Sequence, residues 1–347
     1  MSSKRARVGV AGYGVVGRRR HECMRNNHPH LEVVAVSDIR FEGSGSLETG
    51  LPYCSDFREL LEHEVDAIMV CLPNDVAPEA TIMGLERGMH VFCEKPPGRS
   101  VEDIVAVRHA EAANAGLVLK YGFNHRYHES VKQAKAIIDS GRHGRVLNLR
   151  GVYGKSRMIP FSGGWRSQRA VAGGGILLDQ GIHMLDMIRY FAGEFDEVRS
   201  FVSNDFWGHD VEDNAWALLR NRGSGCVAMV HSTATQWRHK FRLEITLESA
   251  FIELSGILSG SKSYGEEKLT LVERQDGSMI GSFHEETTLF LQDNSWQEEV
   301  DEWGAAIADG DPIQSGGSED ALAVMDLVYR IYCADALWKE RFDLRIR

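Results

Sequence analysis

Two side chains with acid–base chemistry lie four residues apart in the segment LLDQGIHMLDMIRYFAG, residues 177–193. If the segment forms a helix, Asp179 and His183 share one face, because four residues make about one helical turn. A carboxylate and an imidazole held together fit a proton-transfer pair, part of a metal site, or a structural pair. Asp186, one turn further on, is interpreted as structural.

A lysine in the segment CEKPPG is a second candidate. Lys95 lies between Glu94 and Pro96 at the expected carboxyl end of a strand. Ligands of doubly wound sheets bind at that edge, which favours a functional lysine. The residues alone leave a surface Glu–Lys pair before a turn as the alternative.

A glycine pattern supplies the third signal. The segment AGYGVVG places Gly12, Gly14 and Gly17 in the G-x-G-x-x-G spacing between an expected strand and helix, which is typical of a pyrophosphate site. Asp38 follows about 20 residues later, where an acid binds both ribose hydroxyls. The acid predicts NAD rather than NADP, although Arg40 offers a positive charge nearby. The next three residues are interpreted as a solvated helix face rather than a phosphate clamp: Arg18, Arg19 and Arg20.

The elements expected in the first third place these residues at strand ends. Short apolar runs alternate with amphipathic stretches, which indicates a parallel, doubly wound sheet with helices on both faces. The expected strands cover residues 7–12, 32–38, 66–73, 89–96 and 117–123, and the expected helices cover residues 15–27, 56–64, 76–87 and 101–115.

Beyond residue 123 the pattern changes to long two-faced strands joined by hairpins, which suggests a mainly antiparallel sheet. The expected strands lie at residues 146–154, 197–206, 214–236 and 241–256, with helices at residues 129–140, 296–308 and 318–335 and around Asp179. We therefore predict two domains, residues 1–122 and 123–347, in line with a length of 347 residues.

Composition narrows the class of protein. Hydrophobic residues make up 43% and charged residues 26%, as in an ordinary globular protein. A net charge of −11 argues against nucleic acid or an anionic membrane as partner. Six scattered cysteines without a C-x-x-C pair, no apolar run of about 18 residues and a start without a signal-peptide core lead us to expect a cytoplasmic protein.

The order of motifs resembles one family. AGYGVVG, CLPN, GMHVFCEKP, GFNHRYH and GGGILLDQGIHMLD follow one another as in the Gfo/Idh/MocA family, named for glucose-fructose oxidoreductase and inositol dehydrogenase. The resemblance implies an N-terminal Rossmann domain followed by a substrate-binding and oligomerisation domain with a large open antiparallel sheet. It also implies a nicotinamide cofactor and hydride transfer at a hydroxyl-bearing carbon of a sugar, nucleotide-sugar or cyclitol.

Carried over by motif, Lys95 matches the E-K-P lysine, and Asp179 and His183 match the acid and histidine of the second motif. The bond before Pro96 is often cis in such proteins. One position departs from the pattern, because the family frequently has a histidine where this chain has Ala77.

The predicted contacts fall into two groups. Trp165 would stack on a sugar face and Arg166 would bind a carboxylate or phosphate, with a mobile loop over residues 161–175 as the alternative. Expected cofactor contacts are Gly12, Tyr13, Gly14, Val15, Val16, Gly17, Asp38, Ile39, Arg40, Leu72, Pro73, Asn74, Glu94 and Lys95. Expected substrate contacts are Asn124, Arg126 and Tyr127, at the domain junction, with Trp165, Arg166, Asp179 and His183.

Proton transfer is the favoured interpretation of the Asp179–His183 pair. A metal needs three or four converging ligands, and apart from the distant His209 and Asp210 the surrounding sequence offers glycines and apolar residues, so we predict no metal. Oxidation of a secondary alcohol releases the hydroxyl proton, and an imidazole titrates near neutral pH. His183 would accept this proton, Lys95 would stabilise negative charge on the oxygen, and Asp179 would hold substrate hydroxyls.

Two hypotheses of different classes follow. The first is an NAD-dependent dehydrogenase for a small-molecule sugar or cyclitol, with NADP less favoured, which assembles as a homodimer or homotetramer through the C-terminal sheet. The second is a dinucleotide-binding sensor that kept the fold without turnover. The presence of Lys95, Asp179 and His183 favours the enzyme.

Overall fold

A computed structural model describes residues 5–345 except 26–27, 160–163, 261–262 and 275–281. The chain divides into two compact units that interleave along the sequence. Unit 1 comprises residues 1–124, 170–173 and 296–323, and unit 2 comprises residues 125–169, 174–295 and 324–347. The linear division expected from the sequence assigned both later segments of unit 1 to the second domain.

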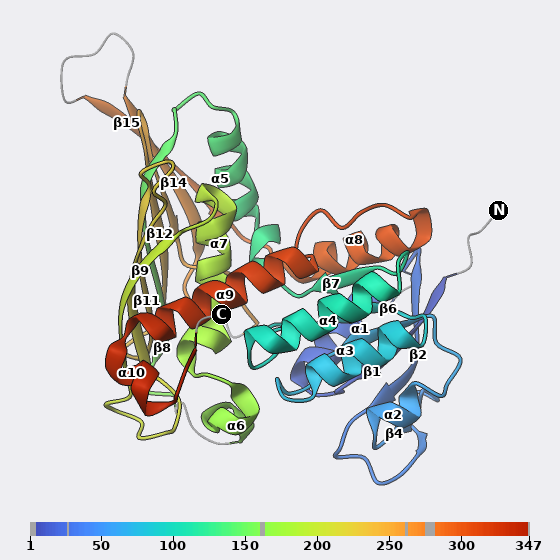
Figure 1. Cartoon of the computed structure of the whole chain (residues 1–347). Coiled ribbons are helices and arrows are strands. Elements are labelled where there is room, and N and C mark those ends of the chain that lie inside the picture. The colour runs from blue at the N-terminus through green and yellow to red at the C-terminus, as the bar shows by residue number, and fades with distance from the viewer. Residues whose placement is uncertain (1–4, 26–27, 160–163, 261–262, 275–281, 346–347) are drawn as a thin grey trace. The chain divides into compact units, whose positions relative to one another are not determined.

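Unit 1 is built on a mostly parallel sheet, as predicted. In the described residues its seven strands follow the order β3-β4-β2-β1-β5-β6-β7, and only the β3–β4 pair is antiparallel (Figure 1). Every strand predicted before residue 123 is present within a few residues. The strands are β1 (Ala6–Ala11), β2 (Leu31–Ser37), β3 (Gly45–Ser46), β4 (Pro52–Cys54), β5 (Ala67–Val70), β6 (His90–Cys93) and β7 (Leu119–Tyr121).

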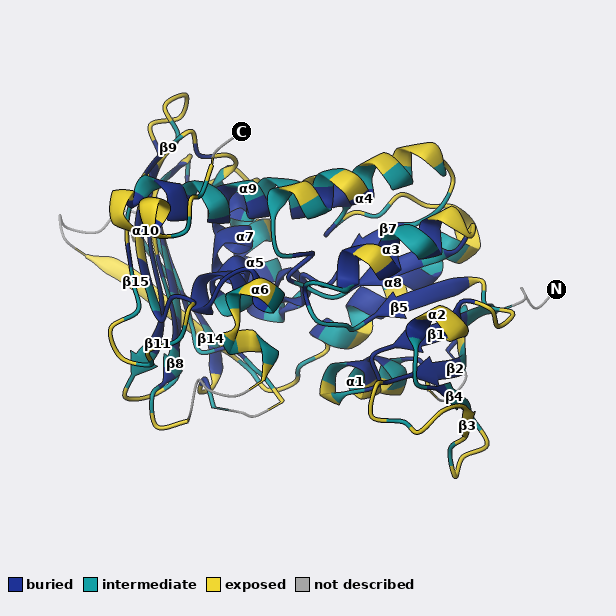
Figure 2. Ribbon diagram, turned by 60° about the horizontal axis from the view of Figure 1, so that its bottom comes forward, coloured by how far each residue is buried: buried dark blue, intermediate teal, exposed yellow. Residues whose placement is uncertain are grey.

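Helices cover both faces of this sheet. Leu60 packs over Gly9 on one face, and on the other Trp303 joins the core around Val10. The trace in Figure 2 shows buried residues on β1 and β5 and exposed residues on α3 and α4. The helices are α1 (Val15–Cys23), α2 (Phe57–Leu60), α3 (Ala77–Glu86), α4 (Val101–Ala113), α6 (Arg169–Ala172), α8 (Ser295–Asp309) and α9 (Ser318–Ala334), which continues into unit 2.

The late return of α8 to unit 1 completes its core. Trp303 is fully buried and its ring packs edge-on against Phe92 of β6 at 5.7 Å between centroids. Val300, also fully buried, joins the same cluster as Val8 and Val10 of β1. The core of the first sheet is therefore completed by a helix that begins 174 residues after the end of β7.

Unit 2 contains the large, mainly antiparallel sheet that the hairpin pattern predicted. In the described residues eight strands follow the order β15-β14-β13-β12-β8-β11-β10-β9, and only the β8–β11 pair is parallel. The edge strand β15 is largely exposed (Figure 2). The strands are β8 (Val146–Ser156), β9 (Glu197–Ser203), β10 (Asn214–Arg220), β11 (Val227–Gln236), β12 (Lys240–Leu247), β13 (Ala250–Ser255), β14 (Glu267–Arg274) and β15 (Phe283–Phe290).

One face of this sheet supports the helix with the acid–base pair. Gly151 of β8 leaves room for it, since a Cβ there would lie 2.5 Å from Met184 Sδ. The helical segments of unit 2 include α5 (Glu129–Asp139), a π-helical turn (Leu177–Gly181), α7 (Ile182–Ala192) and α10 (Ala336–Arg341). Within the described residues, each helix is too short or too polar to cross a bilayer.

Candidate active site

The glycine turn after β1 is shaped for a dinucleotide. Gly12 has φ +87°, and a Cβ there would lie 2.3 Å from the carbonyl oxygen of Cys71. A Cβ on Gly17 would lie 2.1 Å from the carbonyl oxygen of Gly12, so both positions require glycine. Gly14, the N-cap of α1, gives the helix no side-chain cap, and a Cβ there would lie 3.9 Å from Arg40 Nη2. The N–H groups of α1 are thus available to a pyrophosphate, and the turn fits this group.

Asp38 follows β2 directly and is held by Arg40. Arg40 Nε donates to Asp38 Oδ1 at 2.7 Å, and Nη2 donates to Oδ2 at 2.8 Å. Hydrogen bonds from Arg40 keep the pKa of Asp38 below its ordinary value. Arg40 also donates from Nη2 to the carbonyl of Tyr13 at 3.2 Å, so its cation lies beside the glycine turn. Asp38, the acid predicted to bind ribose hydroxyls, and the Arg40 cation therefore lie side by side at the glycine turn.

Two apolar side chains flank this corner in solvent. Val15 and Ile39 are each 89% exposed, although both follow buried strands at the ligand edge. Large aliphatic groups at such exposure are covered when a flat apolar ligand binds against them. Cofactor contact by Val15 and Ile39 stays a prediction.

The end of β5 carries the next predicted contacts. Leu72 and Pro73 are half-buried, and Asn74 is buried, with its Nδ2 donating to the carbonyl of Ala172 at 2.8 Å. Asn74 thereby attaches the 170–173 segment to unit 1. Ala77, where the family frequently has a histidine, is buried at the start of α3.

Lys95 follows β6, as expected, and its bond to Pro96 is cis. The neighbouring Glu94 accepts a hydrogen bond from Arg20 Nε at 2.7 Å. The interpretation of Arg20 as part of a solvated helix face was wrong, because its side chain is fully buried and paired with Glu94 and Glu299. One buried acidic side chain, Glu299, and one half-buried acidic side chain, Glu94, outweigh the usual preference of arginine for solvent.

A buried carboxylate in unit 2 anchors the segment that carries Asp179. Glu212 accepts hydrogen bonds from the N–H of Gly175 at 2.7 Å, from the N–H of Leu177 at 2.9 Å and from the hydroxyl of Tyr332 at 2.7 Å. Burial raises the pKa of Glu212. The expected helix around Asp179 is π-helical over Leu177–Gly181, a rare geometry that occurs often at functional sites.

Asp179 is brought together with the residues predicted for substrate binding on the preceding loop. Arg166 Nε lies 3.6 Å from Asp179 Oδ1, and its guanidinium lies 4.3 Å from the centroid of the Trp165 ring. The first part of the predicted loop, residues 161–163, lies outside the described residues.

His183 is buried in α7 and stacks on a second histidine. The His125 and His183 rings lie 3.7 Å apart with 16° between their planes. His125 Nε2 lies 3.2 Å from the hydroxyl of Tyr153. The motif GFNHRYH contains His125, but nothing in the sequence near it predicts that it stacks on His183, 58 positions away. The hydroxyl of Tyr264, which donates to Gln180 Oε1 at 2.8 Å, was likewise not identified from sequence.

The guanidinium of Arg126 forms a bidentate ion pair with Asp186. Nε donates to Oδ2 at 2.8 Å and Nη2 donates to Oδ1 at 2.6 Å, with both residues buried. Asp186 thus holds Arg126 within unit 2. Asn124 is buried and Tyr127 half-buried in the same turn, and substrate contact by these three residues stays a prediction.

No group of three or more histidine, cysteine or acidic side chains in the described part of the chain is arranged to hold a metal ion. The Asp179–His183 pair thus has no third ligand among those residues.

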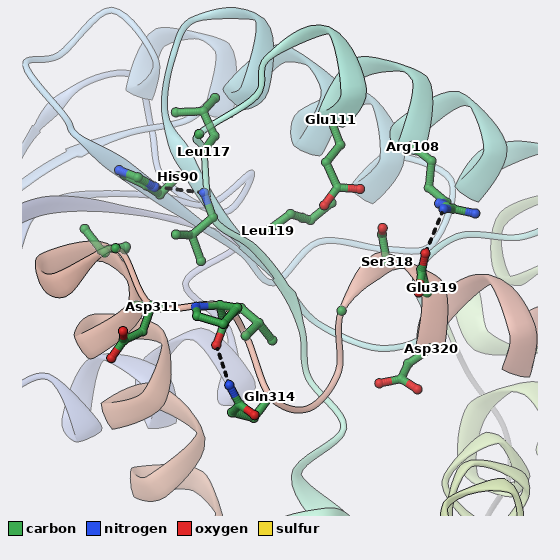
Figure 3. Close-up of a pocket in the computed structure, with 18 residues that line it drawn as sticks. His90, Arg108, Glu111, Leu117, Leu119, Asp311, Gln314, Ser318, Glu319 and Asp320 are labelled. Carbon is green, nitrogen blue, oxygen red and sulfur yellow. Dashed lines mark hydrogen bonds and ion pairs between the residues drawn. The ribbon is translucent and has the colours of Figure 1, made fainter. Parts of the chain in front are cut away.

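A cavity of about 710 Å³ in unit 1 lies away from the glycine turn. Figure 3 shows its polar lining, with Arg108 paired to Glu319, and His90 and Leu119 at its wall. His90 and Leu119 begin β6 and β7, so the cavity opens at the amino ends of the strands. Ligands of doubly wound sheets bind at the opposite, carboxyl ends.

Comparison with protein families decides the relationship. A family model described as "Oxidoreductase family, NAD-binding Rossmann fold" of the Gfo/Idh/MocA group matches residues 6–123. The model of the Gfo/Idh/MocA C-terminal domain matches residues 131–253. The chain belongs to the Gfo/Idh/MocA family. The resemblance inferred from the motifs is thereby confirmed.

Curated relatives of the chain are named as sugar and cyclitol dehydrogenases. The chain is 33% identical to levoglucosan dehydrogenase of Pseudarthrobacter phenanthrenivorans over 51% of this chain and 43% of that protein. It is 34% identical to D-glucoside 3-dehydrogenase of Escherichia coli over 59% of each. It is 27% identical to myo-inositol 2-dehydrogenase of Thermotoga maritima over 69% of this chain and 72% of that protein. The chain thus spans about half the length of the first two relatives.

Solved structures of the Gfo/Idh/MocA family share the whole fold. Levoglucosan dehydrogenase in complex with NADH and levoglucosan superposes with a TM-score of 0.82 at 23% identity, over 96% of this chain and 98% of that one. The expected fold class, a Rossmann domain followed by a large mainly antiparallel sheet, is confirmed.

Proposed function

We propose that this chain is an NAD-dependent oxidoreductase that transfers a hydride between nicotinamide and a secondary hydroxyl or ketone carbon of a sugar, nucleotide-linked sugar or cyclitol. One observation carries the proposal: in a chain of this family the dinucleotide turn is formed, and Lys95, Asp179 and His183 are all present. The sugar and cyclitol relatives support this class of substrate.

The bound nicotinamide would accept or supply the hydride. His183 accepts the proton that leaves the substrate hydroxyl and returns it in the reductive direction. Lys95 stabilises the negative charge that develops on the same oxygen and opposes protonation of His183. Asp179 accepts hydrogen bonds from other hydroxyls and orients the ring.

The proposed cofactor is NAD. A carboxylate at Asp38 repels a 2′-phosphate and accepts both ribose hydroxyls, and its lowered pKa keeps it charged at neutral pH. Arg40 opposes this preference, because its cation would attract the extra phosphate once it left Asp38. We propose that Asp38 prevails.

A substrate panel tests the proposal. Free hexoses, methyl glucosides, inositols and nucleotide-linked sugars are incubated with NAD, and NADH is followed by absorbance. We expect at least one to give turnover that His183→Ala lowers by about 10²- to 10⁴-fold while NADH binding persists. If the protein binds NADH but turns over none of these compounds, the result would contradict the enzyme hypothesis and favour the dinucleotide-binding sensor.

We also propose a homodimer or homotetramer formed through the large sheet. The outer face of β9 and β10 exposes Phe201, Trp216 and Leu218, at 79%, 47% and 55%. With Leu337 of α10 they line a mostly apolar groove of about 620 Å³. Exposed apolar surface of this kind is typical of protein interfaces.

A further inference from the structure

A fully buried guanidinium joins three elements of unit 1. Arg20 of α1 donates from Nε to Glu94 Oε1 at 2.7 Å and from Nη2 to Glu299 Oε2 of α8 at 2.6 Å. Its Nη1 donates to the carbonyl of Trp296 at 3.4 Å. The rings of Phe92 and Trp296 lie 4.5 and 4.2 Å from it. Arg20 is thus fixed by hydrogen bonds and by rings.

The carboxylate of Glu94 has little freedom beside this group. A Cβ on Gly122 would lie 2.8 Å from Glu94 Oε2, so only glycine leaves room at that position. The N–H of Glu94 donates to the carbonyl of Val70, and the N–H of Gly122 donates to the carbonyl of Cys93, both at 2.9 Å. Backbone and side chain of Glu94 are therefore both held immediately before Lys95.

The chemistry of the contact calls for arginine. Burial alone lowers the pKa of Arg20, but the carboxylates of Glu94 and Glu299 outweigh it and raise the pKa, so the cation persists. A planar fork binds two carboxylates at fixed angles, which a lysine ammonium does not reproduce. Arg20 is fully buried, so holding Glu94 is the task that the geometry supports.

We propose that Arg20 is a positioning residue for Lys95. By fixing the Glu94 carboxylate it sets the direction of the following peptide and hence of the Lys95 side chain. The consequence for turnover rests on the proposed function, whereas the placement of Lys95 does not.

Amine labelling tests the placement without a substrate. Lys95 is half-buried, and its reaction with an amine-reactive reagent is followed by peptide mass spectrometry relative to Lys268 on β14. Arg20→Lys should change the Lys95 rate severalfold and leave Lys268 unchanged. The matched control is Glu302→Gln, because Glu302 lies on the same helix as Glu299 but pairs with Lys120 and accepts a hydrogen bond from the N–H of Gln314. An unchanged Lys95 rate in folded Arg20→Lys would overturn the proposal.

Kinetics supply the second test. Arg20→Lys should lower kcat about 10- to 100-fold with little change in NADH affinity, as expected when a catalytic group is misplaced. In a Lys95→Ala background the same change should cost nothing further, whereas additive losses would overturn the proposal. If Arg20→Lys does not fold, Glu94→Gln provides the same comparison. Absent turnover in the wild type would refute only the proposed function, because labelling still decides the placement.

Discussion

At the scale of single residues, we propose that the Asp38–Arg40 ion pair sets the cofactor preference. Because Asp38 is charged at neutral pH, NADH should bind more tightly than NADPH in a titration of protein fluorescence. Asp38→Ala should reverse the order, since Arg40 is then released to a 2′-phosphate. Equal or tighter NADPH binding by the wild type would show that Arg40 outweighs the acid.

Loss of Lys95 tests the electrostatic part of the mechanism. Lys95→Ala should lower turnover by about 10²-fold or more, the size seen when a preorganised charge is removed, and leave NADH binding intact. Lys268→Ala, a change on the exposed side of β14, serves as the matched control. Turnover at the wild-type rate in Lys95→Ala would remove this lysine from the mechanism.

His183 distinguishes proton transfer from metal binding. His183→Ala should cost about 10²- to 10⁴-fold in turnover, and the wild-type oxidative rate should rise with pH as the imidazole loses its proton. Asp179→Asn should weaken substrate binding as well as rate, because its proposed task is to hold hydroxyls.

Exhaustive chelation is the complementary measurement. Activity should survive a chelator unchanged. The opposite result has three parts: the chelator removes activity, zinc restores it, and His183→Ala no longer binds the metal. That result would identify Asp179 and His183 as metal ligands instead of a proton-transfer pair.

At the scale of elements, α8 links the stability of unit 1 to pH. Burial raises the pKa of Glu299 to about 7, more than Arg20 and Lys120 lower it. Between pH 5 and 7 the folded carboxyl still holds a proton that the unfolded chain has released. Its contribution to stability is therefore complete below its ordinary pKa of 4.5 and is lost as the pH rises through 7.

Glu299→Gln removes this titration. From pH 5 to pH 8 the unfolding free energy of the wild type should fall relative to that of the variant by on the order of 2 to 3 kcal/mol. The melting temperature of the wild type should fall with it. Circular dichroism melts at several pH values measure it. Parallel curves for the two proteins would show that Arg20 keeps Glu299 ionised throughout.

At the scale of the whole molecule, the outer face of the large sheet is proposed to join copies. Leu218→Glu places a charge in the groove beside Trp216 and should shift the mass measured by light scattering toward the monomer. Leu291→Glu is the matched control, because Leu291 is 77% exposed and lies beyond β15. A wild-type monomer at micromolar concentration would refute the proposed assembly.

Local patterns determined the two sheets, the class of fold and the candidate catalytic residues. These patterns extend over only a few residues each, so they can be recognised in the sequence alone. They are the alternation of apolar runs, the spacing of Gly12, Gly14 and Gly17, and the E-K-P and D-x-x-x-H motifs. Four strands were not predicted: the short β3 and β4, the exposed β15, and β14 beside it.

Contacts between distant segments decided the rest. Whether Arg20 faces solvent depends on Glu94 and Glu299, which lie 74 and 279 positions away. The stacking of His125 on His183 and the return of α8 to close the first sheet are equally non-local. An arginine or histidine has the same local signature in either setting, because the free energy of its burial comes from partners that only the folded chain brings together.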